Sequence, residues 1–142
     1  MKDLANITWN EKVSFIAESE GHKISMDTFP EHGGENKGVR PKPLLLFSLG
    51  GCTGMDVISI LRKMREKVDY FNIQVEGELT EEHPKYYKKI IVTYQFKGEN
   101  LNPENVKKAV HLSEEKYCGV SAMLRKAAQI ITIIEINGQV IE

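Results

Sequence analysis

The sequence predicts an α+β protein whose mostly antiparallel sheets surround one buried central helix. Apolar and polar residues alternate in several short segments, which is typical of half-buried strands. One longer segment, Pro43–Glu66, is rich in apolar residues and follows helical spacing in its second half. The predicted strands and helices occur in groups rather than in strict alternation, and this grouping favours α+β over a parallel α/β sheet.

The N-terminal part of the chain is predicted to form strands and then a loop. Residues Leu4–Asp27 alternate in character and contain turn signals at Trp9–Glu11 and Glu20–His22, so we expect a hairpin or a three-stranded meander. Residues Thr28–Pro41 are polar and rich in glycine. A loop of this length in a small domain is often functional.

The central segment predicts a helix that Pro43 begins. Because it is apolar on all sides, we expect it to be buried, with Cys52 in the interior. Three glycines at positions 50, 51 and 54 each cost about 1 kcal/mol relative to alanine inside a helix. They indicate a closely packed neighbouring backbone or a small substrate at Cys52. The alternative is a loop over residues 50–54 that joins two shorter helices.

The C-terminal half is predicted to contain a hairpin, two helices and a final strand. The hairpin strands are residues 71–80 and 89–97. Asn102 is placed to cap a helix that Pro103 begins, and Ser121–Gln129 is predicted to form a second, shorter helix. The β-branched segment Ile130–Ile136 then ends at an Asn-Gly turn.

Length and composition favour one cytoplasmic domain over residues 1–142. The net charge of −1 gives no field that would attract nucleic acid. The apolar run Leu44–Leu49 is too short to span a bilayer, and no signal-peptide core is evident, so we expect no membrane partner. A central helix this apolar has few elements to cover it, which predicts a homodimer in which each subunit wraps the other's helix.

The two cysteines, Cys52 and Cys118, carry the candidate chemistry. Two cysteines do not make a disulfide scaffold, so the pair is either incidental or redox-active. If their segments pack together, a peroxide could oxidise one thiol to a sulfenic acid, and the second thiol could condense with it to a disulfide. Such a cycle needs no metal and no organic cofactor. Arg40, followed by Lys42, is the nearest cation in sequence that could stabilise a thiolate.

Two segments resemble the osmotically inducible protein C / organic hydroperoxide resistance (OsmC/Ohr) family. Residues 45–57, Leu-Leu-Phe-Ser-Leu-Gly-Gly-Cys-Thr-Gly-Met-Asp-Val, are similar to the family's first cysteine segment, and residues 115–121, Glu-Lys-Tyr-Cys-Gly-Val-Ser, to its second. The resemblance implies an OsmC-like, intertwined α+β homodimer that reduces organic hydroperoxides. It makes Cys52 the peroxidatic thiol and Cys118 the resolving thiol. It also implies a dithiol reductant such as a lipoylated protein.

The sequence departs from the family pattern at two places. Lys42 occupies the position of a glutamate that, in the hydroperoxide branch, orients an arginine towards the thiolate, and Gly119 stands where proline is common. The alternative function is therefore a dimeric module that binds a small apolar ligand without turnover, and a third is a structural role for two inert thiols. His111 is either a surface residue of its helix or a partner of Cys118 in a nucleophile pair. The scattered histidines form no pair, so we expect no metal site.

Overall fold

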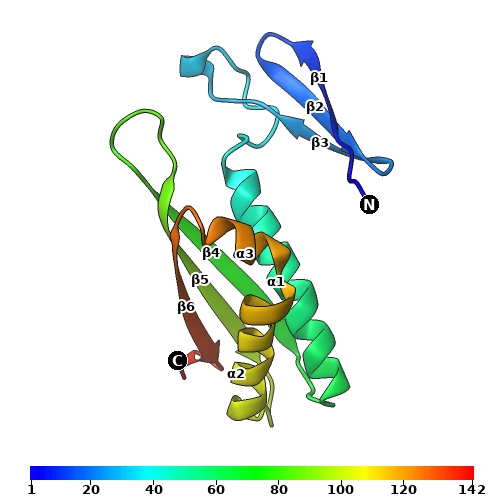
Figure 1. The fold of residues 1–142 in the computed structure, drawn as a ribbon, viewed down its shortest axis with the longest axis vertical. Coiled ribbons are helices and arrows are strands. Elements are labelled where there is room, and N and C mark those ends of the chain that lie inside the picture. Colours follow the sequence, from blue (N-terminus) through cyan, green and yellow to red (C-terminus); the bar gives the residue numbers. More distant parts are fainter. The chain divides into compact units, whose positions relative to one another are not determined.

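The computed structural model describes all 142 residues, which divide into two compact units, Met1–Leu45 and Leu46–Glu142 (Figure 1). Each unit contains one sheet, and helix α1 (Pro43–Lys63) begins at the end of the first unit and continues into the second. The mixed α+β class is confirmed. The prediction of a single domain over residues 1–142 stays a prediction.

The first unit contains a three-stranded antiparallel sheet. Its strands are β1 (Asn6–Glu11), β2 (Ser14–Ser19) and β3 (His22–Met26), paired in the order β1-β2-β3. The meander interpretation is therefore right, but the first turn lies after Glu11 rather than at Trp9–Glu11. Trp9 is a paired strand residue opposite Phe15, so the strand continues through the predicted turn.

The register of this sheet collects apolar side chains on one face. Ile7 is opposite Ala17, which is opposite Ile24, and Trp9 is opposite Phe15. Because alternate residues of a strand point to the same face, these residues share one surface. We call it the apolar sheet face, and it consists of Ile7, Trp9, Phe15, Ala17, Ile24 and Met26. It is poorly buried, since Ile7 is 54% and Trp9 64% exposed.

The loop that follows β3 is organised by the carboxylate of Asp27. Its Oδ1 accepts a hydrogen bond from the backbone N–H of Thr28 at 2.8 Å, and its Oδ2 accepts from the N–H groups of Glu35 and Lys37 at 3.1 Å each. The N–H groups of Lys37 and Thr28 are the main reason that the pKa of Asp27 is lowered. One short 3₁₀ turn, Pro30–His32, interrupts the predicted loop.

The second unit is built on a four-stranded sheet in the order β4-β5-β6-β7. The strands are β4 (Tyr70–Leu79), β5 (Tyr87–Lys97), β6 (Gln129–Ile136) and β7 (Gln139–Val140). Adjacent strands are antiparallel except for β5 and β6, which are parallel. A parallel pair requires a long crossover connection, and here the crossover contains two helices.

These crossover helices are α2 (Pro103–Leu112) and α3 (Gly119–Leu124). The predicted cap of α2 is confirmed, because the Asn102 side chain accepts hydrogen bonds from the N–H groups at positions 104 and 105. Helix α3 is shorter than the predicted Ser121–Gln129, since Gln129 already belongs to β6. Helix α1 is continuous from Pro43 to Lys63, so the alternative of a loop over residues 50–54 is wrong.

The core of the second unit lies between the helices and one face of the sheet (Figure 1). Alternate residues of β5 are buried, as expected for a strand covered on one side. They pack in one cluster with residues of α1, α2 and β6. The fully buried members include Val57 and Leu61 of α1, Val92, Tyr94 and Phe96 of β5, Val106 and Val110 of α2, and Ile134 of β6.

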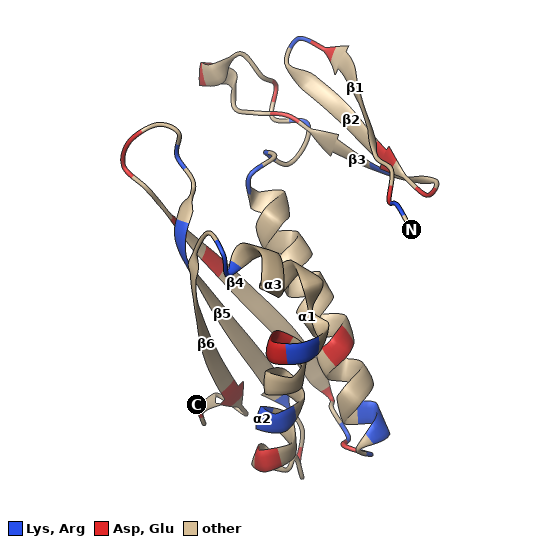
Figure 2. Ribbon diagram, in the orientation of Figure 1, with Lys and Arg blue, Asp and Glu red and all other residues tan.

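Helix α1 is less buried than the sequence predicts. Its inward side includes Leu49 and Thr53, but Phe47 is 62% and Met55 75% exposed. Figure 2 shows few charged residues along this helix. An 18-residue window of α1 has a mean hydropathy of 1.8 and is 22% buried, so by length and composition the helix could cross a bilayer. The apolar segment is therefore longer than the six residues Leu44–Leu49.

Candidate functional site

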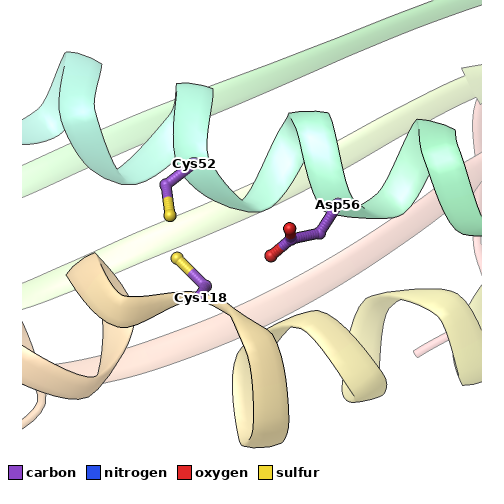
Figure 3. A group of neighbouring side chains, drawn as sticks. All are labelled: Cys52, Asp56 and Cys118. Carbon is purple, nitrogen blue, oxygen red and sulfur yellow. The ribbon is translucent and has the colours of Figure 1, made fainter.

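The two cysteines lie together in the second unit, as the redox hypothesis requires (Figure 3). Cys52 and Asp56 are four residues apart on α1, so they occupy the same side of that helix. Cys118 faces them from the start of α3 (Figure 3). Both sulfur atoms and a carboxylate oxygen of Asp56 all lie within 4.8 Å of one another.

A π-helical turn at the end of α2 places Cys118. The turn spans Ser113–Tyr117, and the N–H of Cys118 donates to the carbonyl oxygen of Ser113, five residues earlier, at 2.7 Å. Cys118 then has an extended backbone and caps α3, with its sulfur accepting a hydrogen bond from the N–H of Ser121 at 3.3 Å. A π-helical turn inside an α-helix frequently marks a functional site.

The two thiols differ in their surroundings. Cys118 is 3% exposed, whereas Cys52 is half-buried. Burial, followed by a hydrogen bond with Cys52, raises the pKa of Cys118 to about 11. Cys118 is therefore a protonated thiol at neutral pH. Cys52 is the more accessible sulfur.

A chain of buried polar side chains connects this cluster to the middle of the core. Ser113 Oγ donates to Asp56 Oδ2 at 2.8 Å. Thr53 Oγ1 lies 2.9 Å from Ser113 Oγ and 2.8 Å from Tyr94 Oη. Tyr94 Oη in turn donates to Glu114 Oε1 at 2.8 Å. We call these five residues, Asp56, Ser113, Thr53, Tyr94 and Glu114, the polar chain.

Glu114 is a site residue that the sequence did not identify, because charged residues of a helix usually face solvent. It is only 9% exposed. Thr132 Oγ1 donates to both of its carboxylate oxygens, at 2.7 and 2.8 Å. The π-helical turn adds a residue to the helical repeat, so Glu114 points inward while Glu115 stays exposed. Arg125 was also missed; its guanidinium donates to the Glu114 carbonyl oxygen and to Ser121 Oγ.

Two other residues that the sequence singled out, Arg40 and His111, each contact a different side chain. Arg40 belongs to the first unit, where its guanidinium lies over the Phe29 ring at 5.0 Å, and its role at the thiol stays a prediction. His111 Nε2 lies 2.6 Å from Glu142 Oε2, which agrees with a surface residue of its helix rather than a partner of Cys118.

A second feature of the second unit is an apolar groove of about 700 Å³ between α1 and β4, and the glycines of α1 line it. A Cβ at Gly50 or Gly54 would lie 3.2 Å from Val75 or 2.9 Å from Ile73, so these glycines let the strand approach closely. A Cβ at Gly51 would meet no atom within 4 Å, because it faces the groove. The lining also includes Leu46, Phe47, Met55, Ile58 and Phe71, and neither cysteine belongs to it. The apolar groove is therefore separate from the two thiols.

Comparison with known proteins identifies the family. The family model of OsmC-like protein matches residues 34–133, which include both cysteines and helices α1, α2 and α3, and the match ends within β6. Protein YhfA of Escherichia coli strain K12 is 36% identical over 133 residues, which are 93% of this chain and 96% of that protein. The chain belongs to the OsmC-like protein family. The resemblance seen in the two cysteine segments is confirmed.

Solved structures of this family share the fold. A hypothetical protein from Aquifex aeolicus VF5 superimposes with a TM-score of 0.85 at 31% identity, covering 96% of this chain and 97% of the other. An organic hydroperoxide resistance protein OsmC from Legionella pneumophila superimposes with a TM-score of 0.70 at 16% identity, covering 95% and 97%. The second likeness shows the fold alone. The OsmC-like fold indicates a soluble protein, in which α1 is the central helix rather than a membrane span.

Proposed function

We propose that this OsmC-like protein reduces organic hydroperoxides with the thiols of Cys52 and Cys118. The observation that carries the proposal is the meeting of the two sulfurs, which are 66 positions apart in sequence and within 4.8 Å in the fold. Membership in a family whose fold is shared with an organic hydroperoxide resistance protein supports the same chemistry. The half-buried Cys52 is the attacking thiol and the buried Cys118 the resolving one.

The cycle balances with two thiols and one hydroperoxide. The Cys52 thiolate attacks the O–O bond, which breaks to give a sulfenic acid on Cys52 and, after protonation, an alcohol. The Cys118 sulfur then attacks the sulfenic sulfur, and the hydroxyl group leaves with the Cys118 proton as water. The product is a Cys52–Cys118 disulfide. A dithiol reductant, such as a lipoylated protein, returns both cysteines to thiols by two exchange steps and becomes a disulfide itself.

A homodimer in the cytoplasm is part of the proposal. The apolar sheet face and the exposed apolar residues Phe47 and Met55 of α1 are large surfaces that a second copy would bury. Arg40 is proposed to stabilise the Cys52 thiolate, because the hydroperoxide branch of the family uses an arginine for this task. Lys42, in the position of the family's glutamate, would add positive charge.

The first test measures consumption of cumene hydroperoxide with dithiothreitol as reductant. Wild type should turn over, Cys52→Ser should lose activity to the uncatalysed rate, and the exposed-site control Glu115→Gln should match wild type. One equivalent of hydroperoxide should reduce the mass of wild type by two hydrogens. Cys118→Ser should instead stop at a sulfenic acid that dimedone traps, which assigns the attacking and resolving roles. Equal rates for wild type and Cys52→Ser would refute the proposal.

The groove supports a second candidate, the binding of a small apolar ligand without turnover. Its volume of about 700 Å³ is within the range of ligand pockets. The dissociation constant of a medium-chain fatty acid, measured by calorimetry, should be unchanged in Cys52→Ser. Binding should be lost in Gly51→Leu, because position 51 lines the groove and its added Cβ would meet no atom within 4 Å. Unchanged binding in Gly51→Leu would exclude the groove.

A further inference from the structure

We infer that Cys52, Asp56 and Cys118 form a three-donor binding site for a thiophilic divalent cation, with Zn²⁺ as the ion that the donor set fits best. The inference goes beyond the peroxidase proposal and does not rest on it. The sequence predicts no metal site because it offers no pair of close histidines. The fold instead adds one carboxylate to two thiols, with all three donor atoms within 4.8 Å of one another.

The spacing of the donors agrees with tetrahedral coordination. Zn²⁺ binds cysteine sulfur at about 2.3 Å and carboxylate oxygen at about 2.0–2.2 Å, and the tetrahedral angle then separates the donors by roughly 3.5–3.8 Å. The observed separations of up to 4.8 Å need to contract by at most about 1.3 Å. Cys52 and Asp56 are held by one helix, so rotation of short side chains achieves this contraction. Figure 3 shows both sulfurs and the carboxylate converging on the same space.

Neighbouring groups already orient two of the three ligands. Ser113 Oγ donates to Asp56 Oδ2 at 2.8 Å, which fixes the carboxylate through one oxygen and leaves its other oxygen to bind a cation. The N–H of Ser121 donates to Cys118 Sγ at 3.3 Å, a contact that favours a thiolate. Hydrogen bonds of this kind around a metal site commonly determine ligand geometry and metal affinity. The polar chain behind Ser113 makes its hydroxyl a rigid support.

Three protein ligands leave one tetrahedral position for water or an exogenous ligand. Cys118 is buried, but Cys52 and Asp56 are half-buried, so the site is accessible rather than sealed. As the cation binds, each thiol releases its proton to solvent and no electrons are transferred. A Cys52–Cys118 disulfide removes both sulfur ligands, and a bound cation withdraws both sulfurs from oxidation. Metal binding and disulfide formation are therefore mutually exclusive.

The test uses the reduced, metal-free protein and measures Zn²⁺ binding by calorimetry and Co²⁺ binding by absorption. Wild type should bind one cation per chain, with tetrahedral ligand-field bands and thiolate-to-cobalt charge transfer. Asp56→Asn should weaken binding at least tenfold, since even loss of a supporting hydrogen bond costs about 10–100-fold. Ser113→Ala should weaken it by about tenfold for that reason. Glu115→Gln, a nearby exposed carboxylate, serves as the matched control and should bind like wild type.

Two results would overturn the inference. The first is absence of binding at micromolar Zn²⁺ in wild type whose thiols are shown to be reduced. The second is an unchanged dissociation constant in Asp56→Asn, which would mean that the thiols alone chelate the ion. In wild type, Zn²⁺ should also protect both cysteines from iodoacetamide. None of these readouts uses hydroperoxide, so failure of the peroxidase proposal and failure of the metal site are distinguishable.

Discussion

Each of the two units of this chain is stabilised internally in a different way. In the second unit, the helices bury one face of the sheet, and the polar chain inside that core has all of its side chains hydrogen-bonded. In the first unit, the sheet keeps its apolar face exposed, and the loop after β3 depends on three backbone hydrogen bonds to one carboxylate. The second unit thus has a core of its own, whereas the first has apolar surface that only another surface could bury.

The largest effect is expected from removing the buried carboxylate of the second unit. Glu114→Ala removes the carboxylate that accepts from the hydroxyls of Tyr94 and Thr132, and leaving a buried polar group unsatisfied costs about 1–3 kcal/mol. We expect a loss of about 2–4 kcal/mol in the free energy of unfolding, measured by urea denaturation.

The neighbouring Glu115 provides the control for this variant. It is exposed, so Glu115→Ala should change stability by less than about 0.5 kcal/mol. Similar losses for the two variants would show that the polar chain does not support the core. Glu114→Gln keeps an acceptor for both hydroxyls and should recover part of the loss.

A smaller effect is expected from the apolar sheet face, and it should depend on protein concentration. Ile7→Thr and Ile24→Thr keep β-branching and replace exposed apolar groups. In a single chain such changes are nearly neutral, but at a buried dimer interface each should cost about 1 kcal/mol or more of association free energy. Sedimentation equilibrium of wild type and variants measures this directly.

Lys23→Thr is the matched control, because position 23 lies on the opposite face of β3 and is exposed. It should leave the dimer unchanged. A monomeric wild type would contradict the homodimer proposal itself. A dimer that tolerates both isoleucine changes would place the interface elsewhere, for example on the exposed side of α1.

The sequence was sufficient for features that local chemistry determines. The Asn102 cap, the Asn137-Gly138 turn and the alternation of β5 each depend on a few neighbouring residues. The meeting of Cys52 and Cys118 was expected only on the condition that their segments pack together, which the structure shows. Features that tertiary packing determines could not be predicted from the sequence. The inward position of Glu114 requires the π-helical turn, and no local pattern predicts that turn.

The position of Asp56 beside both thiols could not be predicted for a related reason. Its spacing of four residues from Cys52 predicts only that the two side chains share one side of the helix. Only the tertiary structure adds Cys118 and the supporting Ser113 hydroxyl to the same place. The parallel pairing of β5 and β6 was missed similarly, since strand direction across a long crossover is a property of the whole fold.

The smallest and most local effect is expected at Asp27, and it should depend on pH. Its folded-state pKa is lowered by the N–H groups of Lys37 and Thr28, so its contribution to stability is fully present above the unfolded-state pKa of about 3.9. The contribution is lost as pH falls through the lower folded-state pKa. The amide proton chemical shifts of Glu35 and Lys37, measured by NMR, should therefore titrate with a midpoint below about pH 3.9. Asp27→Asn should abolish that titration and loosen the loop while leaving amide shifts in β5 unchanged. A midpoint at or above the unfolded value would mean that the carboxylate does not organise the loop, and the contrast between the two units would then rest on apolar burial alone.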